Sequence, residues 1–581
     1  MQNGCPLPKR KERLFMPKDP NDVNGNGPVV PTAHTYNDTL YRAAKDYLDN
    51  ISPTSPPAPA KIEEEILGSC ASAIRMENAL REKGEKWKIP QTLPPFVIAL
   101  ILLYVHHVVN IVEDDKKPEE GLLAYYCDDG INQGIYNCIT SDLNNLIRQY
   151  NRRITNRELQ DVIKILSDDA EHRIKRTTDP DLIPLHNGIF DYRTKQLLPF
   201  DPKYVFTWKS PVDYNPQAQN ISIYNPEDNT YWNVEDWMNT LNNDPEVIKL
   251  LWQIIGAMLR PNVPWDQAAW FYSESGNSGK GTLCSLLRNI VGESACASIS
   301  LSQFSKEFYL EQLTHCSAIV VDENDVGTYI DQAAGVKAVI THDKLTINRK
   351  YLNPICIRFR GMMVQCLNEM PRIKDKSDSF FRRHIFVPFD KCFTGSERKY
   401  IKEDYLHRKE VLEYVVYKVL NMDYYAFTVP TSCIDALETY REYNDPVRSF
   451  ATEFLHRLVW DLVPYRFLYD LYKAWYKETQ PNGTIAGLQS FTQDIMQVVN
   501  NKVVPGWYAL GGGKKRIRTG AKMNKAEPLI DEYHLEQWMD PRYAKGRDLE
   551  TKCHPILNNT YAGIIRDTAT NVDADDDEDI N

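Results

Sequence analysis

The chain has 581 residues, of which 42% are hydrophobic and 25% are charged, and its net charge at pH 7 is −11. Such a length exceeds one hydrophobic core and suggests three or four domains, and the composition is ordinary for a soluble globular protein. The acidity argues against a histone-like coat on nucleic acid. Much of it, however, lies in Asp573–Asp579, and a DNA channel needs only local positive charge.

Cysteine usage and the search for targeting signals indicate the cellular compartment of the protein. The 12 cysteines are spread singly, without a C-x-x-C pair or a spacing suited to zinc, so we expect a reducing cytoplasm and no structural metal. The basic run Lys9–Arg13 is not followed by an apolar stretch, so no signal peptide is predicted. The longest hydrophobic stretch, Leu93–Val112, is interrupted by proline, histidine and asparagine, which favours a buried helix over a membrane span.

The N-terminal part is predicted to be an arm followed by a mostly helical region. Residues 1–60 are rich in proline, asparagine and charge and predict a flexible arm, in which Lys9–Arg13 is either a solvated tail or a contact to DNA or a partner. Residues 61–235 predict a helical or mixed domain. Ile62–Leu80 is expected to be a helix, helical patterns dominate from residue 122 to residue 167, and Ile154–Asn156 is typical of a capped helix start.

Phe271–Leu283 predicts a phosphate-binding loop between a strand, Ala268–Tyr272, and a helix, Thr282–Ile290. Glycines there let the backbone approach phosphates, and Lys280 reaches the β- and γ-phosphates. The predicted nucleotide-binding residues are Gly276, Asn277, Ser278, Gly279, Lys280, Gly281 and Thr282. Upstream, Val234–Leu259 predicts a helix with an apolar stripe.

The loop departs from G-x-x-x-x-G-K-[ST] at two positions. Glu274 stands where the first glycine belongs, and Gly281 stands where the serine or threonine belongs. Thr282, one place later, supplies the expected hydroxyl for Mg²⁺. Taken alone, the segment is also compatible with an ordinary Gly/Ser turn before a helix.

A second candidate feature is the apolar segment Ser317–Val321, which runs into Asp322 and Glu323. A continuously apolar strand is typical of a buried parallel sheet, whose chemistry lies beyond the carboxyl ends of its strands. We assign Asp322 to Mg²⁺ and Glu323 to activation of the attacking water, although the two roles are exchangeable. A capped turn with two solvated acids is the alternative.

Two further features follow along the chain. The predicted strand Met362–Leu367 ends at Asn368, whose amide can contact the γ-phosphate or the attacking water, or simply occupy a turn before proline. Arg382 and Arg383 precede a predicted strand, Ile385–Phe389. Paired arginines beside an ATP site suggest an arginine finger toward a neighbouring subunit's nucleotide, with a surface salt bridge as the alternative.

The order of these motifs resembles the superfamily 3 helicases, in the phage, plasmid and poxvirus primase–helicase branch. The resemblance covers residues 121–395 and, more loosely, residues 440–505. Leu182–Asp191 and Tyr204–Pro216 are similar to signatures that precede the helicase core in that branch. The resemblance implies a multidomain α/β protein with a P-loop AAA+-type ATPase core at 236–395, built on a parallel sheet with flanking helices, which binds ATP and Mg²⁺ and assembles as a homo-hexamer or similar ring.

In that family, the segment corresponding to Gly335–Tyr351 forms a hairpin that grips a DNA strand in the central channel. Its cations can neutralise phosphates, and Tyr351 would stack on a base or on an arginine. The candidates for DNA contact are Lys337, Lys344, Arg349 and Lys350. Thr341–Asp343 stands where the family has Gly-Gly-Asp, and Asp343 is expected to fix the hairpin turn. A solvated surface hairpin is the alternative.

The C-terminal part predicts a second DNA-binding region. Residues 396–440 predict a helical connector, with a helix from Lys402 to Leu420, and residues 531–581 a tail with an acidic end. Between them, residues 441–530 contain two amphipathic helices and a Gly-rich basic stretch, which indicates a winged-helix-like domain. The cations expected on its wing, or on a disordered basic loop, are Lys514, Lys515, Arg516 and Arg518.

These features, together with the resemblance, predict an ATP-dependent DNA helicase for replication of a phage, plasmid or integrated mobile element, translocating on single-stranded DNA. The expected location is the cytoplasm of a bacterial host. Its expected partners are single-stranded or forked DNA, further copies of itself, and a separate primase or polymerase, because no Asp-x-Asp primase module is apparent. No membrane partner is expected. A P-loop small-molecule kinase, suggested by Gly279–Thr282, and a non-catalytic origin-binding protein are the alternatives.

Overall fold

The computed structural model describes residues 35–52, 55–113, 121–169, 171–350, 352–479, 485–509, 515–543 and 549–567. Several predicted features therefore lie outside the described residues: the basic run 9–13, Tyr351, Lys514 and the acidic end 573–579. The chain divides into two compact units. One comprises Met1–His107 with Asn144–Ile165, and the other comprises Val108–Leu143 with Leu166–Asn581.

The first unit is helical. Its elements are α1 (Tyr36–Asp49), α2 (Pro59–Ala79), α3 (Pro95–Val105) and most of α4 (Thr140–Tyr150) and α5 (Asn156–Asp168). Helix α2 confirms the predicted helix there, and α5 begins as predicted, because the Thr155 hydroxyl accepts a hydrogen bond from the Glu158 backbone while the Glu158 carboxylate accepts one from the Thr155 backbone.

Helix α1 lies inside the segment predicted to be a flexible arm, so that prediction is wrong for residues 36–49. The helix starts at a capping box between Thr35 and Asp38. Leu40, Ala44 and Leu48 then recur at the four-residue spacing of one helical face, and all three are buried. The surrounding proline and asparagine concealed this short apolar stripe.

The long apolar stretch, residues 93–112, forms α3, which has 11 residues and an almost fully buried centre, and then the short strand Val109–Ile111. The predicted buried helix is therefore confirmed only for residues 95–105. A transmembrane helix needs about 20 apolar residues. Throughout the part of the chain that the structure describes, no helix combines the length and apolarity needed to cross a bilayer.

The second unit opens with strands rather than the predicted helices. A four-stranded sheet has the order β3-β2-β1-β4, and its strands are β1 (Val109–Ile111), β2 (Leu122–Tyr126), β3 (Tyr136–Asn137) and β4 (Arg173–Ile174). The prediction of helix from residue 122 is therefore wrong up to residue 137. Leu122 and Ala124 are buried while Leu123 is only half-buried, an alternation that is the period of a strand.

The first of the two segments that resemble family signatures forms two strands of a small sheet, β5-β6-β7, which consists of β5 (Leu182–Leu185), β6 (Gly188–Asp191) and β7 (Gln196–Leu198). The second segment is hydrogen-bonded to it. The Asn187 side chain accepts a hydrogen bond from the Tyr214 backbone N–H and donates one to the Tyr214 carbonyl. Gly188 has a φ of +154°, and a Cβ there would lie 2.6 Å from the Leu198 carbonyl oxygen. These signatures therefore act in the fold rather than in chemistry.

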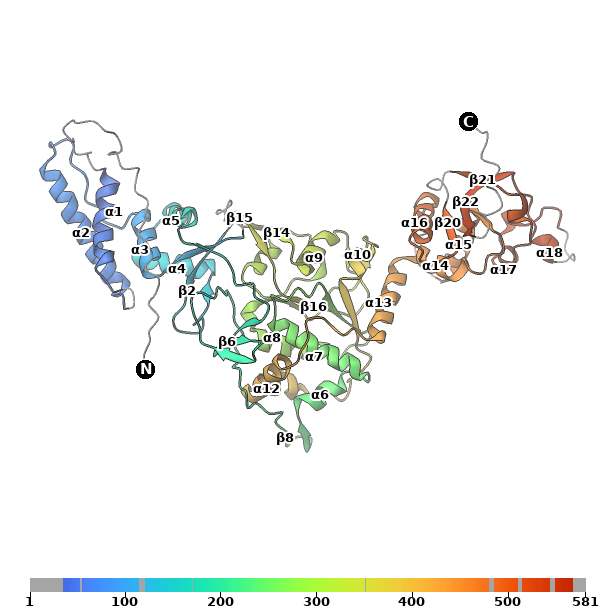
Figure 1. The fold of residues 1–581 in the computed structure, drawn as a ribbon, viewed down its shortest axis with the longest axis horizontal. Coiled ribbons are helices and arrows are strands. Elements are labelled where there is room, and N and C mark those ends of the chain that lie inside the picture. The colour runs from blue at the N-terminus through green and yellow to red at the C-terminus, as the bar shows by residue number, and fades with distance from the viewer. Residues whose placement is uncertain are drawn as a thin grey trace. The chain divides into compact units, whose positions relative to one another are not determined.

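The core of the second unit is a five-stranded sheet with the order β11-β12-β16-β10-β18 (Figure 1). Every neighbouring pair is parallel. The strands are β10 (Ala268–Tyr272), β11 (Cys296–Ala297), β12 (Ala318–Val321), β16 (Met362–Leu367) and β18 (His384–Pro388). The predicted strands at residues 268–272, 317–321, 362–367 and 385–389 are thereby confirmed within one residue at each end.

Successive residues of these strands face two different cores. On one face Phe271, Val364 and Val387 join a cluster formed with α7 (Pro245–Leu259), α8 (Lys280–Val291) and α12 (Lys409–Leu420). On the other face Trp270 and Phe386 join a cluster formed with α9 (Ala333–Ile340), α10 (Asp378–Phe381) and α13 (Thr431–Asn444). Figure 1 shows these two sets of helices on opposite sides of the sheet. The chain is thus a multidomain α/β protein with a parallel sheet covered on both faces.

Two segments predicted as single helices are each broken. Residues 234–259 form α6 (Val234–Thr240) and α7, because Pro245 cannot continue a helix and instead starts one, capped by Asp244. Residues 402–420 contain the end of α11 (Lys399–Glu403), a 3₁₀ turn at Tyr405–His407, and α12. Upstream of α6 lies the hairpin formed by β8 (Ile223–Asn225) and β9 (Thr230–Trp232).

The C-terminal part has its own core. Its helices are α14 (Pro446–Phe454), α15 (Tyr465–Thr479), α16 (Leu488–Asn500), α17 (Leu529–Glu532) and α18 (Leu549–Lys552). Its strands are β19 (Leu462–Pro464), β20 (Trp507–Ala509), β21 (Arg516–Arg518) and β22 (Thr560–Arg566), of which β22 pairs with the other three. The two predicted helices are confirmed as α15 and α16. The central strand β22, however, comes from the segment that was predicted to be a tail.

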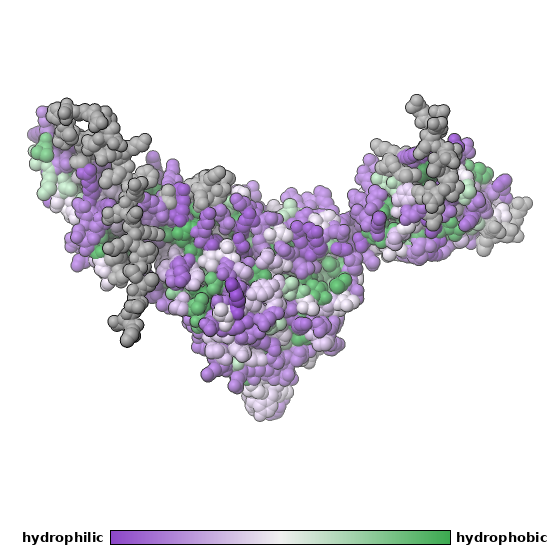
Figure 2. Space-filling view, viewed as in Figure 1, coloured by the Kyte–Doolittle hydropathy of each residue, from purple (hydrophilic) through white to green (hydrophobic). Residues whose placement is uncertain are grey.

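Hydrophilic residues cover most of the face shown in Figure 2, and its apolar patches are small and separate. Scattered apolar surface of this kind is normal and marks no interface by itself. The search for function therefore turns to cavities and charges.

The buried His384 makes the stability of the sheet depend on pH. Burial lowers the pKa of its imidazole to about 3, whereas the unfolded value is 6.5. The folded state therefore resists protonation, and stability that is fully present above pH 6.5 is lost as the pH falls toward 3. At about 1.4 kcal/mol per pH unit, the loss at pH 5 is about 2 kcal/mol.

We expect the melting temperature of His384→Phe to fall less between pH 7 and pH 5 than that of the wild type. The phenyl ring keeps the contacts with Trp270 and Phe380 but does not titrate. His456→Phe, at an exposed histidine, is the control and should keep the wild-type pH dependence. Equal pH dependence in all three proteins would contradict the assignment.

Candidate nucleotide site and nucleic-acid contacts

The predicted phosphate loop lies between β10 and α8. Asn277 and Gly279 both have positive φ, 54° and 88°. These two left-handed residues turn the chain so that α8 begins directly after them, at Lys280. Backbone N–H groups at such a helix start attract anions. Lys280 is only 6% exposed, and its ammonium donates to the Ser278 hydroxyl at 3.1 Å.

Burial lowers the pKa of the Lys280 ammonium, while the neighbouring Cys366 and Cys284 thiols and then the Glu323 carboxylate raise it. A phosphate anion in contact with this ammonium would favour its charged form. The site is therefore built so that the lysine is better satisfied with an anionic ligand than without one.

The two departures from the usual loop pattern have different surroundings. Glu274 accepts a hydrogen bond from the Tyr272 hydroxyl at 3.0 Å and does not line the cavity described below. At Gly281, a built Cβ would lie 3.9 Å from the Lys402 ammonium. This distance is an ordinary van der Waals contact, so the described surroundings, which include a lysine from α11, would also admit a serine or threonine and do not explain the glycine.

The order of the strands brings the other predicted residues to this loop. Strand β16 lies between β10 and β12, so Asn368, which follows β16, stands between Lys280 and the acids that follow β12. The Asn368 amide donates to the Glu323 carboxylate at 3.3 Å. Open α/β sheets place ligands at this carboxyl edge.

Asp322 is held by Arg288 of α8. The guanidinium lies 2.9 Å from one Asp322 oxygen and also donates to the Val320 carbonyl at 2.7 Å. This pairing fixes the carboxylate and leaves its second oxygen for another ligand. Sequence reasoning did not assign Arg288, because a single arginine on a helix face carries no motif.

A buried asparagine anchors the turn that carries the acids. The Asn324 amide donates to the Gln365 side chain at 2.9 Å and to the Cys366 carbonyl at 3.1 Å, both in β16. Its side-chain oxygen accepts from the Leu301 backbone at 2.9 Å. Asn324 therefore ties the ends of β12 and β16 together without touching the cavity.

One cavity of about 880 Å³ contains these residues. Such a volume is within the usual range for sites of small molecules and cofactors. The predicted residues that line it are Gly276, Asn277, Ser278, Gly279, Lys280, Gly281, Thr282, Asp322, Glu323 and Asn368. The structure thus brings the complete predicted nucleotide-binding set together with both acids.

Two walls of the cavity were not predicted. One is residues 393–403, which hold the phosphate loop: the Phe393 backbone donates to the Asn277 carbonyl, and the Asn277 amide donates to Glu397 at 3.1 Å. This wall adds Arg398, Lys399 and Lys402 to the cavity. The basic cluster that begins at residue 398 was the signal in the sequence, but it fell beyond the expected end of the ATPase domain at residue 395.

The second wall is residues 231–241, from β9 and α6. It carries Trp232, which is 4% exposed and whose buried indole N–H has no hydrogen-bond partner in the described part of the chain. The same wall contains the exposed ring of Tyr231 and the amide of Asn233. Aromatic and amide groups of this kind suit a flat heterocyclic ring.

The residues at the acidic edge fit a divalent cation. Thr282, Asp322 and Glu323 offer a hydroxyl and two carboxylates around the same cavity. Mg²⁺ prefers oxygen ligands and usually takes one or two carboxylates together with substrate phosphates. The donor set therefore suits Mg²⁺ bound jointly with a phosphorylated ligand.

Arg382 and Arg383 lie at the amino-terminal end of the parallel strands, opposite the end that carries the phosphate loop. They precede β18, which runs parallel to β10 with His384 opposite Ala268 and Pro388 opposite Tyr272, so a strand length separates them from their own phosphate loop. Neither lines the cavity. Arg383 donates to the Ser379 carbonyl within the chain, whereas Arg382 is exposed.

The predicted DNA-contacting segment begins with a helix. Residues 335–340 belong to α9, and the hairpin is formed only by β14 (Lys344–Arg349) and β15 (Leu352–Arg358). Lys337 lies on that helix and forms an ion pair with Asp375 at 2.6 Å, so the prediction that it belongs to the hairpin is wrong. Lys344 and Lys350 are exposed, and Arg349 is half-buried.

The Thr341–Asp343 departure has a conformational basis. His342 has a φ of +55°, a left-handed conformation that glycine adopts most easily. Its ring accounts for the substitution, because Nδ1 lies 2.8 Å from the Phe359 carbonyl and the side chain is buried. Asp343 accepts from the Thr341 hydroxyl at 2.6 Å, so it fixes the start of the hairpin rather than its tip.

The basic stretch of the C-terminal part is partly described. Arg516 and Arg518 lie on β21, which pairs with β22, and Lys515 precedes them. Arg516 donates to the Thr560 hydroxyl at 3.0 Å and to the Thr560 carbonyl at 2.7 Å, both neutral acceptors. Its positive charge therefore remains on the exposed edge of the sheet.

Three segments match families of known proteins. Residues 271–383 match a family of unknown function, DUF5906. Residues 105–244 match the family described as D5 N terminal like, and residues 442–538 match the one described as Poxvirus D5 protein-like. In the sequence, the two D5-type matches precede and follow the segment that forms the parallel sheet. They support a phage or viral replication enzyme of the primase–helicase type.

Solved structures of the NrS-1 C terminal region are also similar. The A form apo structure is 13% identical, with 76% of this chain and 91% of that chain covered and a TM-score of 0.37. A second apo structure of that region, spanning 305–718, is 14% identical, with 71% and 91% covered and the same TM-score of 0.37. Because both TM-scores are low, this likeness carries no argument about the present chain.

Substitution of Gly279 is expected to disrupt the phosphate loop more than substitution of Gly276. A Cβ at Gly279 would lie 2.7 Å from Leu241 on a backbone with a φ of +88°, whereas a Cβ at Gly276 meets nothing within 4 Å. The left-handed conformation alone costs an L-residue about 1–2 kcal/mol. Gly279→Ala should therefore lose most of its affinity for a fluorescent ATP analogue, with Gly276→Ala as the matched control. Equal affinities in the two variants would contradict this geometry.

Proposed function

We propose that this protein is an ATP-dependent DNA helicase that replicates a phage, plasmid or integrated mobile element. The observation that carries the proposal is the position of β16 between β10 and β12, which groups Lys280, Glu323 and Asn368 around one cavity. The similarity to D5-type families supports the replication context.

In this proposal each side chain has a physical role. The N-terminus of α8 and Lys280 bind the β- and γ-phosphates. Thr282 and the free oxygen of Asp322 hold Mg²⁺, which neutralises charge on the phosphates when it is bound. Glu323 orients the attacking water and accepts its proton, and the Asn368 amide, already bonded to Glu323, fixes the direction of that carboxylate.

Lys402 adds a phosphate contact that the usual loop pattern does not contain. Its ammonium stands beside Gly281 and forms no ion pair with a described residue. An uncompensated cation at this point would stabilise the negative charge of the triphosphate. The base of ATP would then lie toward the wall at residues 231–241, where Tyr231 and Trp232 provide aromatic surface.

The site is expected to be completed by a second copy of the chain. Arg382 lies too far from its own phosphate loop and is exposed at the other edge of the sheet. In a ring, the same residue of a neighbouring copy would approach the γ-phosphate, as an arginine finger does. The exposed Lys344 and Lys350 of the hairpin would contact the phosphates of a DNA strand, with Arg349 beside them.

ATP hydrolysis with and without single-stranded DNA tests the function. The wild type should hydrolyse ATP, and a dT oligonucleotide should stimulate it several-fold, while Lys280→Ala should lose about 10²-fold or more of the rate, because the phosphate contact acts in the transition state. Hydrolysis that needs a small acceptor and ignores DNA would instead indicate the kinase alternative, and no hydrolysis would indicate a non-catalytic DNA-binding protein.

The same assay measures the contribution of Lys402. Lys402→Ala should raise the KM for ATP or lower kcat by about tenfold, the effect of one lost charge contact. Lys164→Ala, an exposed lysine on α5, is the matched control and should behave as the wild type. Wild-type kinetics in Lys402→Ala would exclude its contact with phosphate.

Mixing two inactive variants tests the shared site. Lys280→Ala and Arg382→Ala should each be inactive alone, since each lacks one half of every site. In a random equal mixture roughly a quarter of the interfaces combine an intact lysine with an intact arginine, and activity should return. A mixture that stays inactive, although the two variants co-assemble, would contradict the role of Arg382 across the interface.

A further inference from the structure

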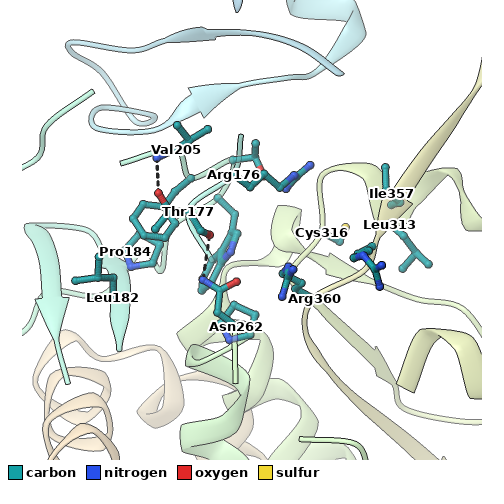
Figure 3. Close-up of a pocket in the computed structure, with 15 residues that line it drawn as sticks. Arg176, Thr177, Leu182, Pro184, Val205, Asn262, Leu313, Cys316, Ile357 and Arg360 are labelled. Atoms are coloured by element: carbon teal, nitrogen blue, oxygen red, sulfur yellow. Dashed lines mark hydrogen bonds between the residues drawn. The ribbon is translucent and has the colours of Figure 1, made fainter. Parts of the chain in front are cut away.

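Three arginines surround a second, smaller cavity at the base of the β14–β15 hairpin. Arg358 ends β15, Arg360 follows it, and Arg176 comes from the segment after β4. Figure 3 shows Arg176 and Arg360, from segments far apart in the chain, around the same cavity. Its volume is about 40 Å³, whereas one water needs about 10–15 Å³. The cavity can therefore take a small polyatomic group but not a nucleoside.

The positive charge of this arginine cluster is not balanced by ion pairs. Arg176 donates to the Thr207 hydroxyl at 2.8 Å and to the Thr314 carbonyl at 3.3 Å, and Arg358 donates to the His342 carbonyl at 3.0 Å. All three acceptors are neutral. Among the residues that the structure describes, none of the three arginines has a carboxylate within ion-pair distance.

Arg360 is the least satisfied member of the cluster. Its Nε is buried and has no hydrogen-bond partner among the residues that the structure describes. Burial lowers the pKa of its guanidinium, the Glu113 carboxylate raises it, and Arg358 and Arg176 lower it further. Among the described residues, the Glu113 carboxylate, which makes no direct contact, thus faces three guanidinium groups. A buried donor that lacks an acceptor is unfavourable, so an anion would both complete the hydrogen bonding and compensate the charge.

We propose that Arg176, Arg358 and Arg360 bind one phosphate group of a single-stranded nucleic acid. Guanidinium groups match the oxygens of a phosphate in pairs. Arg358 lies opposite Lys344 in the hairpin, so positive charge continues from the exposed hairpin to the cavity. The choice of a nucleic-acid strand over free phosphate rests on the proposed DNA role of that hairpin, but not on ATP hydrolysis.

The salt dependence of binding tests this site. The affinity for a fluorescent dT oligonucleotide would be measured by anisotropy over a series of salt concentrations. Arg360→Gln should weaken binding about three- to tenfold and reduce the slope of log K against log salt. The reduction should be at most about 0.7, the value for complete loss of one phosphate contact on a single strand, because Arg176 and Arg358 still face that phosphate. Arg360→Lys should keep the slope because it keeps the charge. Arg157→Gln, at an exposed arginine of α5, should match the wild type.

Other outcomes would overturn the proposal. An unchanged slope in Arg360→Gln, with lower melting temperatures in both Arg360 variants, would show that Arg360 acts only in packing. If inorganic phosphate raised the melting temperature of the wild type but not of Arg360→Gln, and strand binding were unchanged, the ligand would be free phosphate and not DNA. Arg358→Gln, with the same expected loss of slope, replaces Arg360→Gln if that variant does not fold.

Hydrolysis of ATP by the wild type, followed in parallel, separates this site from the proposed function. A reduced slope in Arg360→Gln together with a wild type that hydrolyses no ATP would support the phosphate site and remove the helicase proposal. An unchanged slope with active hydrolysis would do the reverse.

Discussion

The alignment of three parallel strands, β10, β16 and β12, is the constraint on which the proposed nucleotide site depends. Parallel strands end at the same edge of a sheet, so the residues that follow each strand must meet there. Asn324 reinforces this alignment, because it joins the end of β12 to two positions in β16. The phosphate loop, the acids and Asn368 come from distant parts of the chain, and this edge is what makes them neighbours.

The departures from the usual phosphate loop have definite surroundings in the structure. Glu274 is bonded to Tyr272 outside the cavity, and Gly281 leaves room beside the ammonium of Lys402. Likewise, His342 replaces a glycine at a left-handed position because its ring is buried and bonded to the Phe359 carbonyl. For His342 a neighbour distant in sequence therefore accounts for the unusual residue, whereas Glu274 is bonded two residues away and no described contact requires glycine at position 281.

Sequence patterns predicted the elements whose signal is local. The strands of the parallel sheet are continuous apolar runs, and the phosphate loop has its own glycine and lysine spacing, so both could be recognised from a single segment. The same patterns failed where proline lies next to an apolar segment or inside it. The proline-rich surroundings concealed α1, and Pro245 divides a run of apolar residues that looked like one helix.

Long-range contacts could not be predicted. The basic cluster that begins at Arg398 is visible in the sequence, but it does not indicate that Lys402 lines a cavity with Lys280. That placement, like the placement of Trp232, depends on how residues 393–403 and 231–241 fold against the phosphate loop. Strand β22 similarly completes the C-terminal sheet from a segment that carries no strand partner nearby in the sequence. The positive charge of Lys337 suggested a DNA contact, but the sequence did not show that this lysine forms an ion pair with Asp375.

The central claim is that binding and hydrolysis of ATP at this sheet edge drive the chain along DNA. Strand displacement on a forked DNA substrate with a labelled strand tests it most directly, with Glu323→Gln as the variant that keeps the shape of the site but lacks the carboxylate. The account predicts that the wild type releases the labelled strand only when ATP and Mg²⁺ are present and that Glu323→Gln does not. A wild type that releases no strand, or releases it equally well without ATP, would contradict it.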